Sequence, residues 1–200
     1  MKRNYLTEDE IHHLLNAATK GNHHHRDYCM IMMAFLHGLR VSELLSLKVE
    51  DYDPLSMKIN IHRLKGGFST IHPLLPEENI TLQRWLIERK KWIKKESSWL
   101  FISQKGNKLS RQRFYNLLRK YGKISDLPLT VHPHMLRHAC GYHLAERGND
   151  TRLIQDYLGH RNIRHTVRYT AANAARFVSA WTKNGHTPEF PTINSFEQPT

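Results

Sequence analysis

The sequence has few of the residues that build disulfide-stapled or membrane-spanning proteins. It contains only two cysteines among 200 residues, which is too few for a disulfide framework. Cys29 and Cys140 lie in apolar stretches of helical character, so we expect reduced thiols that pack in the interior. No apolar run reaches the roughly 18 residues that a spanning helix needs. The N-terminus, Met-Lys-Arg-Asn-Tyr-Leu-Thr, also lacks the apolar core of a signal peptide. These absences predict a cytoplasmic, nucleoid-associated protein with no membrane-spanning segment.

Acidic residues are also scarce. The sequence has 18 Asp and Glu against 30 Lys and Arg, which gives a formal net charge of +12 and a pI of about 9.9. This balance favours a polyanionic partner but does not separate nucleic acid from an anionic membrane surface. A basic, solvated surface would explain it equally well. The hydrophobic content of 40% is enough for a core, and the length suits one domain.

Histidine is abundant, with 15 residues, and His23, His24 and His25 are consecutive. This run suggests a metal site, because His12 and His13 lie nearby. However, adjacent histidines in a turn rarely converge on one ion, and neither cysteine nor carboxylate stands at ligand spacing. We therefore predict no metal site. A metal-binding stress protein is a weak alternative that rests on the histidine content alone.

Hydrophobic periodicity predicts a mainly α-helical protein with a small antiparallel β-sheet, an α+β fold. The first helix is marked by a capping box, in which Thr7 is the N-cap and Glu10 stands three residues later. Apolar alternation on both sides of 65–67 indicates a β-hairpin, and residues 51–54 are expected to form a turn. The expected helices cover about 7–19, 26–37, 41–47, 76–94, a segment after Ser110, 134–147, a segment from 150 or 151, 163–170 and 172–182, and the expected strands cover 57–64 and 68–75.

Four residues in the C-terminal half form a pattern with a chemical meaning. His134 and Arg137 are three residues apart, so a helix places them on one face, and His160 and Tyr169 follow. A guanidinium forks onto two phosphate oxygens, imidazoles donate hydrogen bonds or move protons near neutral pH, and a phenol can become a covalent nucleophile. Each residue alone is more often a packing or surface residue. Together they suit a site that grips and attacks a phosphodiester.

This pattern resembles that of the tyrosine site-specific recombinases, the phage integrase family. In that family His-x-x-Arg is followed by Leu-Gly-His and then by a tyrosine nine residues on, as Tyr169 follows His160 here. The stretch 38–44, Gly-Leu-Arg-Val-Ser-Glu-Leu, resembles the family's first arginine box. Lys65 precedes Pro73 by the spacing of the family's hairpin lysine.

The resemblance covers about residues 5 to 182, and two stretches within it are similar to one particular group of the family. Residues 62–74 and 150–167 are similar to the fimbrial phase-variation recombinases of enteric bacteria, short enzymes that invert a promoter-bearing DNA segment.

The resemblance implies an enzyme that cuts and rejoins DNA without a metal or a nucleotide cofactor. Tyr169 would attack the scissile phosphate and form a 3′-phosphotyrosine. Arg40 and Arg137 would stabilise the phosphate charge, His160 would donate a further hydrogen bond, and Lys65 would protonate the leaving 5′-oxygen. The implied catalytic residues are Arg40, Lys65, His134, Arg137, His160 and Tyr169, with His134 positioning the phosphate or accepting the tyrosine proton, and Glu43 is expected to brace Arg40.

The resemblance also implies partners and domain limits. The expected partners are double-stranded DNA with inverted-repeat sites, three further copies of the chain, and accessory DNA-bending proteins in the nucleoid. Family members commonly carry a separate N-terminal domain that clamps DNA. Here the arginine box begins at residue 38, so we expect residues 1–182 to be the catalytic domain alone and 183–200 to be a polar tail.

Two points stay open at the level of sequence. Lys108, Arg111 and Arg113, at the start of a basic helix, are candidates for phosphate contacts, but a solvated face is an equal alternative. The enzyme interpretation also has rivals on the same scaffold, namely a non-catalytic DNA-binding regulator and a type IB topoisomerase that relaxes DNA without a partner strand.

Overall fold

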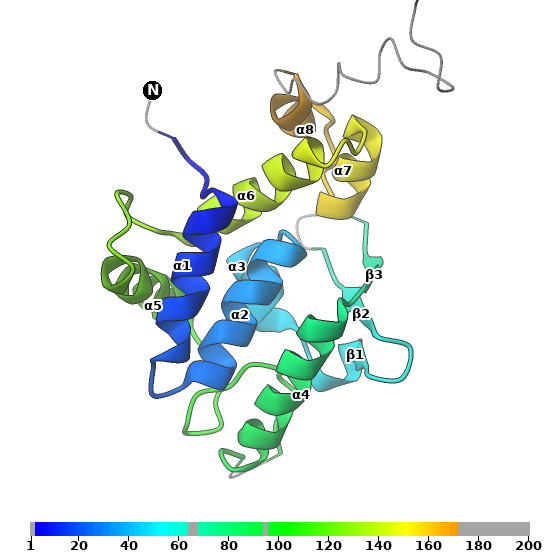
Figure 1. Cartoon of the computed structure of the whole chain (residues 1–200). Coiled ribbons are helices and arrows are strands. Elements are labelled where there is room, and N and C mark those ends of the chain that lie inside the picture. The colour runs from blue at the N-terminus through cyan, green and yellow to red at the C-terminus, as the bar shows by residue number, and fades with distance from the viewer. Residues whose placement is uncertain (1–2, 64–67, 94–95, 172–200) are drawn as a thin grey trace, which may run out of the picture.

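The computed structural model describes residues 3–63, 68–93 and 96–171 as a helical protein with one small sheet (Figure 1). The fold class expected from the sequence is confirmed. The helices are α1 (Glu8–Thr19), α2 (His24–Leu36), α3 (Val41–Ser46), α4 (Pro76–Lys90), α5 (Arg111–Ile124), α6 (Pro133–Glu146), α7 (Thr151–Leu158) and α8 (Arg164–Thr170), with a 3-10 turn at Val49–Asp51. The strands are β1 (Tyr52–Asp53), β2 (Lys58–Ile61) and β3 (Thr70–Pro73), paired antiparallel in the order β1-β2-β3.

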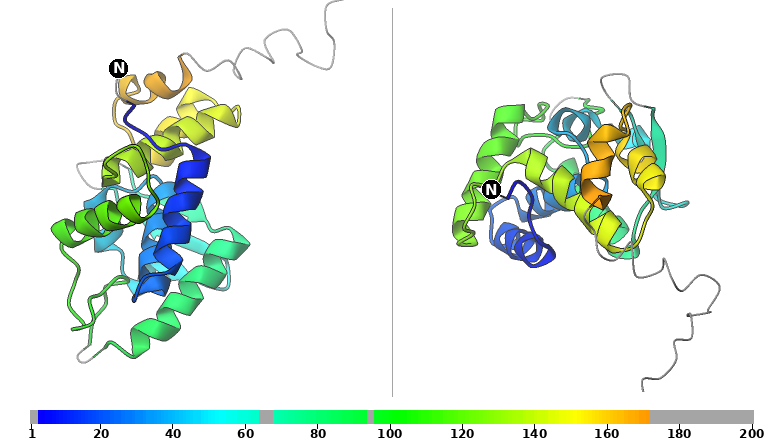
Figure 2. Two further views of the ribbon diagram at one scale, coloured as in Figure 1. Left: turned by 60° about the vertical axis from the view of Figure 1, so that its left-hand side comes forward. Right: turned by 90° about the horizontal axis from the view of Figure 1, so that it is seen from above.

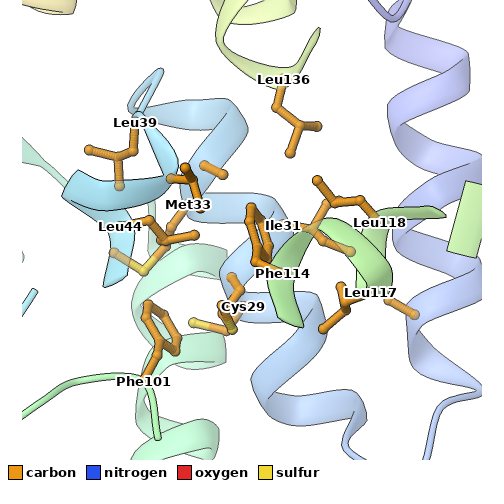
Figure 3. Close-up of a cluster of buried hydrophobic side chains, with 14 of the residues drawn as sticks. Cys29, Ile31, Met33, Leu39, Leu44, Phe101, Phe114, Leu117, Leu118 and Leu136 are labelled. Carbon is orange, nitrogen blue, oxygen red and sulfur yellow. The ribbon is translucent and has the colours of Figure 1, made fainter. Parts of the chain in front are cut away.

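Helix α2 lies at the centre of the main core and packs against α1, α4 and α6. Apolar side chains of α3, α5 and α6 lie in one cluster with those of α2 (Figure 3). Both cysteines are free and buried, as the sequence predicts. The labelled core side chains of Figure 3 are Cys29, Ile31, Met33, Leu39, Leu44, Phe101, Phe114, Leu117, Leu118 and Leu136. Burying one such aliphatic or aromatic side chain stabilises the fold by roughly 1.5–3 kcal/mol, so this core holds the helices that carry the polar site.

A second, smaller apolar cluster joins α6, α7 and α8. Its buried members are Cys140, Ala145, Ile154, Leu158 and Tyr169. In Figure 2, seen from above, α8 lies between α6 and α7. These three helices stand at one end of the molecule and α4 extends toward the other (Figure 1). Within the described part of the chain, every helix is too short or too polar to cross a membrane.

Several helix ends follow from local chemistry that the sequence shows. Thr7 and Glu10 form the predicted capping box, with 3.3 Å from the Glu10 N–H to Thr7 Oγ1 and 2.9 Å from the Thr7 N–H to Glu10 Oε2. Asp150 caps α7 by accepting from two backbone N–H groups. Gly159 ends α7 in the left-handed conformation, with φ of 65°, which glycine adopts without steric cost.

Other boundaries differ from those that the sequence predicts. Helix α2 starts at His24 and not at residue 26, because the chain offers no side-chain cap that would mark its beginning. Strand β1 lies where a turn was expected, and its two residues are too few for an alternation to be visible. Helix α6 starts one residue early, at Pro133, whose ring suits the first helical position. The hairpin tip with Lys65 and the expected helix at 172–182 lie outside the described residues.

Candidate active site

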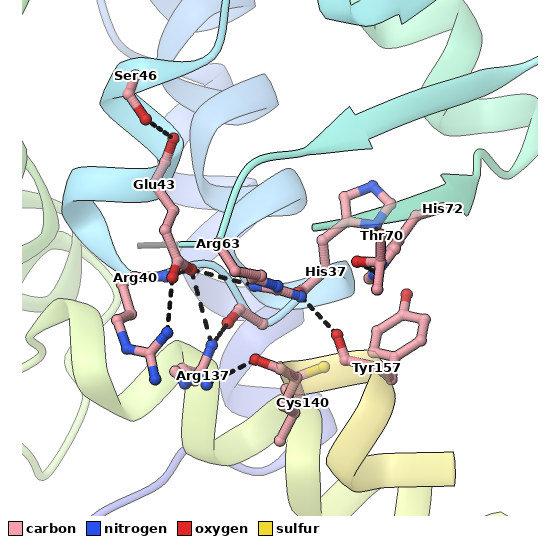
Figure 4. A network of polar contacts seen from close by, with 12 residues as sticks. His37, Arg40, Glu43, Ser46, Arg63, Thr70, His72, Arg137, Cys140 and Tyr157 are labelled. Atoms are coloured by element: carbon pink, nitrogen blue, oxygen red, sulfur yellow. Dashed lines mark hydrogen bonds and ion pairs between the residues drawn. The ribbon is translucent and has the colours of Figure 1, made fainter. Parts of the chain in front are cut away.

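The centre of the site is the carboxylate of Glu43, which is 1% exposed and lies among three arginines (Figure 4). Glu43 is the third residue of α3 and accepts from the backbone N–H of Arg40 at 2.9 Å and from its guanidinium at 2.6 Å. Arg63 donates to it at 3.0 Å, and Arg137 lies 3.8 Å away. Burial alone would raise the pKa of Glu43, but the Arg40 N–H and the charges of Arg63 and Arg137 outweigh burial and lower it. The carboxylate is therefore ionised and holds the three cations together.

Arg137 comes from α6 and is 5% exposed. Its guanidinium donates to the carbonyl of Gly38, before α3, and to the carbonyl of Leu158, at the end of α7, the latter at 2.8 Å. Burial, followed by the charge of Arg40, lowers the pKa of Arg137 to about 10, so the group stays charged at neutral pH. Arg137 thus ties together three segments that are distant in the sequence.

A polar cavity of about 360 Å³ opens above these arginines. Its lining is almost free of apolar side chains and carries no acidic residue among those described. The lining residues are Arg40, His134, Arg137, His138, Gly159, His160, Arg161, Asn162, His165 and Arg168. Such a concentration of cations and imidazoles suits an anionic ligand with several oxygens, such as a phosphodiester.

His160 enters this cavity immediately after the turn at Gly159. Its Nδ1 lies 2.9 Å from the hydroxyl of Thr166, and its carbonyl accepts from Gln155. Burial, followed by the charges of Arg137 and Arg40, lowers the pKa of His160 to about 3. The imidazole is therefore neutral, and if the Thr166 hydroxyl donates to Nδ1, the hydrogen on Nε2 can be donated to a ligand.

Tyr169 lies behind the cavity wall and is 2% exposed. Its hydroxyl is 3.0 Å from His138 Nδ1 and 3.2 Å from Arg168 Nη2, and its ring stacks on His160 with 6.3 Å between the ring centroids. Burial raises the pKa of the phenol, against the opposing charges of Arg168 and Arg137. The ring of His160 thus lies between the phenol and the cavity that Arg40 and Arg137 line, and the phenol is covered in this conformation.

The model of the phage integrase family matches residues 4–176 of this chain. The chain belongs to the phage integrase family.

Curated relatives place this family member among the tyrosine recombinases. It is 55% identical over 180 residues to the type 1 fimbriae regulatory protein FimB of Escherichia coli (strain K12), which covers 90% of each chain. It is 54% identical over 184 residues to FimE of the same strain, covering 92% of this chain and 93% of the relative. The tyrosine recombinase XerA of Pyrococcus horikoshii is 36% identical over 168 residues, which cover 82% of this chain and 55% of XerA.

Solved structures agree with this placement. The crystal structure of XerA recombinase superposes with a TM-score of 0.77 at 30% identity, covering 93% of this chain and 66% of that one. The XerH site-specific recombinase, bound to its difH substrate before cleavage, superposes with a TM-score of 0.76 at 26% identity, covering 89% of this chain and 53% of XerH. The family resemblance and the enzyme class expected from the sequence are confirmed, and this chain is a site-specific tyrosine recombinase.

The recombinase structure brings most of the expected catalytic residues together. Arg40, His134, Arg137 and His160 line one cavity, and Tyr169 lies against its wall. Lys65 falls outside the described residues. The roles assigned to these side chains stay predictions, because the structure shows their proximity and not their chemistry.

Arg63 belongs to this site and was not singled out from the sequence. Its side chain is 0% exposed, and it donates to Glu43, to the carbonyl of His37 and to the carbonyl of Tyr157. The signal that could have found it is the strand period, because Ile59 and Ile61 face inward and Arg63 continues that series. An inward-facing arginine requires a buried acceptor, and Glu43 supplies it.

The three basic residues Lys108, which precedes α5, and Arg111 and Arg113, in its first turn, face different ways. Arg111 lies within electrostatic range of His134, whose pKa is lowered first by burial, then by His132, Arg137 and Arg40, and last by Arg111. Arg113 instead lines a separate hollow with His23 and Tyr121. Lys108 is exposed, and its ammonium lies 3.6 Å from the ring centroid of Trp99. The role of these three residues as phosphate contacts stays a prediction, and of the three Arg111 is described near a residue that lines the cavity.

Gly141 allows Tyr169 to pack on α6. A Cβ atom at Gly141 would lie 2.6–2.8 Å from three ring carbons of Tyr169, so we expect Gly141→Ala to destabilise the protein by roughly 1–3 kcal/mol. Urea unfolding measures this. In a Tyr169→Ala background most of the penalty should vanish, because the clashing ring is gone. An unchanged stability in Gly141→Ala would show that the phenol does not pack here in solution.

Proposed function

We propose that this recombinase cuts DNA with Tyr169 and uses the arginine pair, His134, His160 and Lys65 to do so. The observation that carries the proposal is the shared anchoring of Arg40 and Arg137 on Glu43, beside a cavity whose lining residue His138 contacts the hydroxyl of Tyr169. In phosphoryl transfer the protein chiefly positions the groups and stabilises charge. Two fixed guanidiniums beside a phenol meet both needs.

In the proposed reaction a phosphodiester occupies the cavity. Arg40, 25% exposed at its side chain, and Arg137 bind the non-bridging oxygens, and His160 donates a hydrogen bond to the same phosphate. Tyr169 forms a 3′-phosphotyrosine while the 5′-oxygen leaves with a proton from Lys65. The phosphotyrosine conserves the bond energy, so a 5′-hydroxyl of the partner strand can reverse the step without ATP. Tyr169 is 2% exposed in this structure, so its hydroxyl must become accessible to the phosphate before attack.

The proposed biological event is inversion of a promoter-bearing segment that controls fimbrial phase variation. It is supported by the 55% identity to the type 1 fimbriae regulatory protein FimB. Inversion requires four copies on two inverted-repeat sites, so we propose a tetramer on DNA, helped by accessory DNA-bending proteins. The catalytic domain is proposed to be residues 1–182, with 183–200 as a tail.

A plasmid assay tests this function. The chain is co-expressed with a cassette flanked by inverted repeats, and orientation and supercoiling are both read. Inverted segments are expected. Relaxation without inversion would favour the type IB topoisomerase alternative, and binding without either product would favour a non-catalytic regulator.

The proposed acid role of Lys65 predicts a selective rescue. Lys65→Ala should slow cleavage of ordinary DNA by about 10²-fold or more, the usual contribution of general acid–base catalysis. A 5′-bridging sulfur at the scissile phosphate leaves without a proton, so the same variant should cleave that substrate at nearly the normal rate. Adduct formation on matched oxygen and sulfur substrates measures the effect. Equal slowing on both substrates would contradict the assignment.

The orientation of α5 predicts that Arg111 and Arg113 differ in DNA binding. Arg111→Ala should weaken binding and reduce the slope of log K against log salt by about one, because one fewer counterion is released. Arg113→Ala, on the same helix but turned from the cavity, is the matched control and should change the slope by less. Titrations at several salt concentrations measure this. Equal slopes for both variants and the parent protein would remove α5 from the DNA interface.

A further inference from the structure

His138 lies one residue beyond Arg137 on α6 and is not among the catalytic residues expected from the sequence. In the structure its Nδ1 is 3.0 Å from the hydroxyl of Tyr169. His138 also lines the cavity that holds the arginine pair. It therefore touches the proposed nucleophile on one side and the space for the phosphate on the other.

The hydrogen-bond pattern fixes which partner donates. Arg168 Nη2 lies 3.2 Å from the Tyr169 oxygen, and a guanidinium has donors only. The phenol thus accepts from Arg168, and its single hydrogen needs an acceptor of its own, because buried hydroxyls rarely stay unsatisfied. Among the described residues, His138 Nδ1 is the other hydrogen-bond partner of that oxygen. The phenol therefore donates to an unprotonated Nδ1.

The surroundings of His138 keep the imidazole unprotonated until a substrate arrives. Burial comes first, and the charge of Arg168 on α8 and the groups His134, Arg137 and His132 at the start of α6 act in the same direction, so the pKa of His138 is lowered to about 4. A phosphate in the cavity adds a negative charge beside the ring, which moves the pKa back upward. The imidazole would then become a better proton acceptor when the substrate is in place.

We propose that His138 is the general base that removes the proton from Tyr169 during cleavage. This inference rests on the proposed function, because it needs Tyr169 as the nucleophile. As the phenol oxygen bonds to phosphorus, its proton passes to His138 Nδ1, the bond from phosphorus to the 5′-oxygen breaks, and that oxygen takes a proton from the proposed acid. Religation runs the same transfers backward, with His138 returning the proton to the phenol.

The family resemblance implied that His134 either positions the phosphate or accepts the tyrosine proton, and the geometry favours His138 for the proton. His134 is exposed, its ring lies against that of His132, and it has no hydrogen bond to the Tyr169 hydroxyl among the described contacts. His134 remains placed to contact the phosphate, since it lines the cavity. The two histidines therefore have different roles in the proposal. His138 accepts the proton of Tyr169, and His134 contacts the phosphate of the substrate.

The test uses His138→Asn, whose amide oxygen can accept the phenol hydrogen bond but cannot hold a proton at neutral pH. Single-turnover formation of the covalent adduct is followed on a nicked suicide substrate between pH 5 and 9, with saturating protein. We expect the rate of His138→Asn to fall by about 10²-fold or more, with DNA affinity within about threefold. The acid-side decline of the parent enzyme, where His138 becomes protonated, should be absent. His143→Asn, on the same helix, should match the parent.

A second variant distinguishes the loss of the base from a loss of the folded structure. His138→Ala should regain part of its rate when free imidazole is added, and the regained rate should rise with pH as imidazole deprotonates. Parent-like rates and pH profiles in both variants would overturn the inference, and so would faster cleavage, which would show that His138 restrains the phenol. An adduct formed by Tyr169→Phe would instead refute the proposed function itself, so the two failures are distinguishable.

Discussion

Tyr169→Phe should bind DNA normally and form no detectable covalent adduct. The ring keeps its packing on His160 and against Gly141, so the substitution removes one oxygen and little else. Loss of the hydroxyl leaves His138 and Arg168 without one partner. That loss costs roughly 1–3 kcal/mol of stability, which is too little to unfold a typical domain. The nucleophile is absent, so the nicked suicide substrate should give no protein–DNA species on a denaturing gel.

Tyr142→Phe is the matched control for this result. Tyr142 belongs to the same cluster, with its ring centroid 5.1 Å from that of Tyr169, and it too loses a single hydroxyl. We expect its adduct yield to equal that of the parent protein. An undiminished adduct in Tyr169→Phe would assign the nucleophile to another residue, which peptide mapping of the adduct would identify.

The parts of the fold that the sequence predicts are those set by neighbours in the chain. The capping box of Thr7 and Glu10, which is found as expected, and the glycine stop at Gly159 both depend on residues within one turn. Strand β1 was missed because two residues carry no period. Sequence patterns between near neighbours therefore predict most helices and strands. The residues at which these begin and end also depend on tertiary packing, which such patterns do not describe.

The convergence of the site could not be derived from spacing alone. Arg137 reaches the carbonyl of Gly38, 99 residues away in the chain, and only the family resemblance brought these segments together beforehand. Arg63 was missed because a charged residue on an inward strand position is unusual. His138 was missed because its partner lies on α8, a helix whose placement over α6 depends on the second apolar cluster.

Glu43→Gln should cause a large loss of both stability and activity. The carboxylate is 1% exposed and faces the guanidiniums of Arg40, Arg63 and Arg137. A glutamine keeps the volume but removes the negative charge and turns an amide donor toward groups that are themselves donors. Breaking a buried ion pair in this way costs roughly 3–5 kcal/mol. Urea unfolding should show this, and adduct formation should fall because Arg40 loses its anchor.

The difference in unfolding free energy between the parent protein and Glu43→Gln should depend on pH, and the pKa of Glu43 sets the direction. The pKa of Glu43 is lowered from the ordinary value of 4.5, so its contribution to stability is fully present above that value and is lost as the pH falls through the lower folded-state pKa. The gap in unfolding free energy between the parent protein and Glu43→Gln should therefore be widest near neutrality and shrink below about pH 4.5. Glu50→Gln, in an exposed pair with Lys48, should show almost no gap at any pH. A Glu43→Gln protein as stable as Glu50→Gln at pH 7 would mean that the three arginines do not depend on this carboxylate, and the proposed anchoring of the phosphate-binding pair would fail with it.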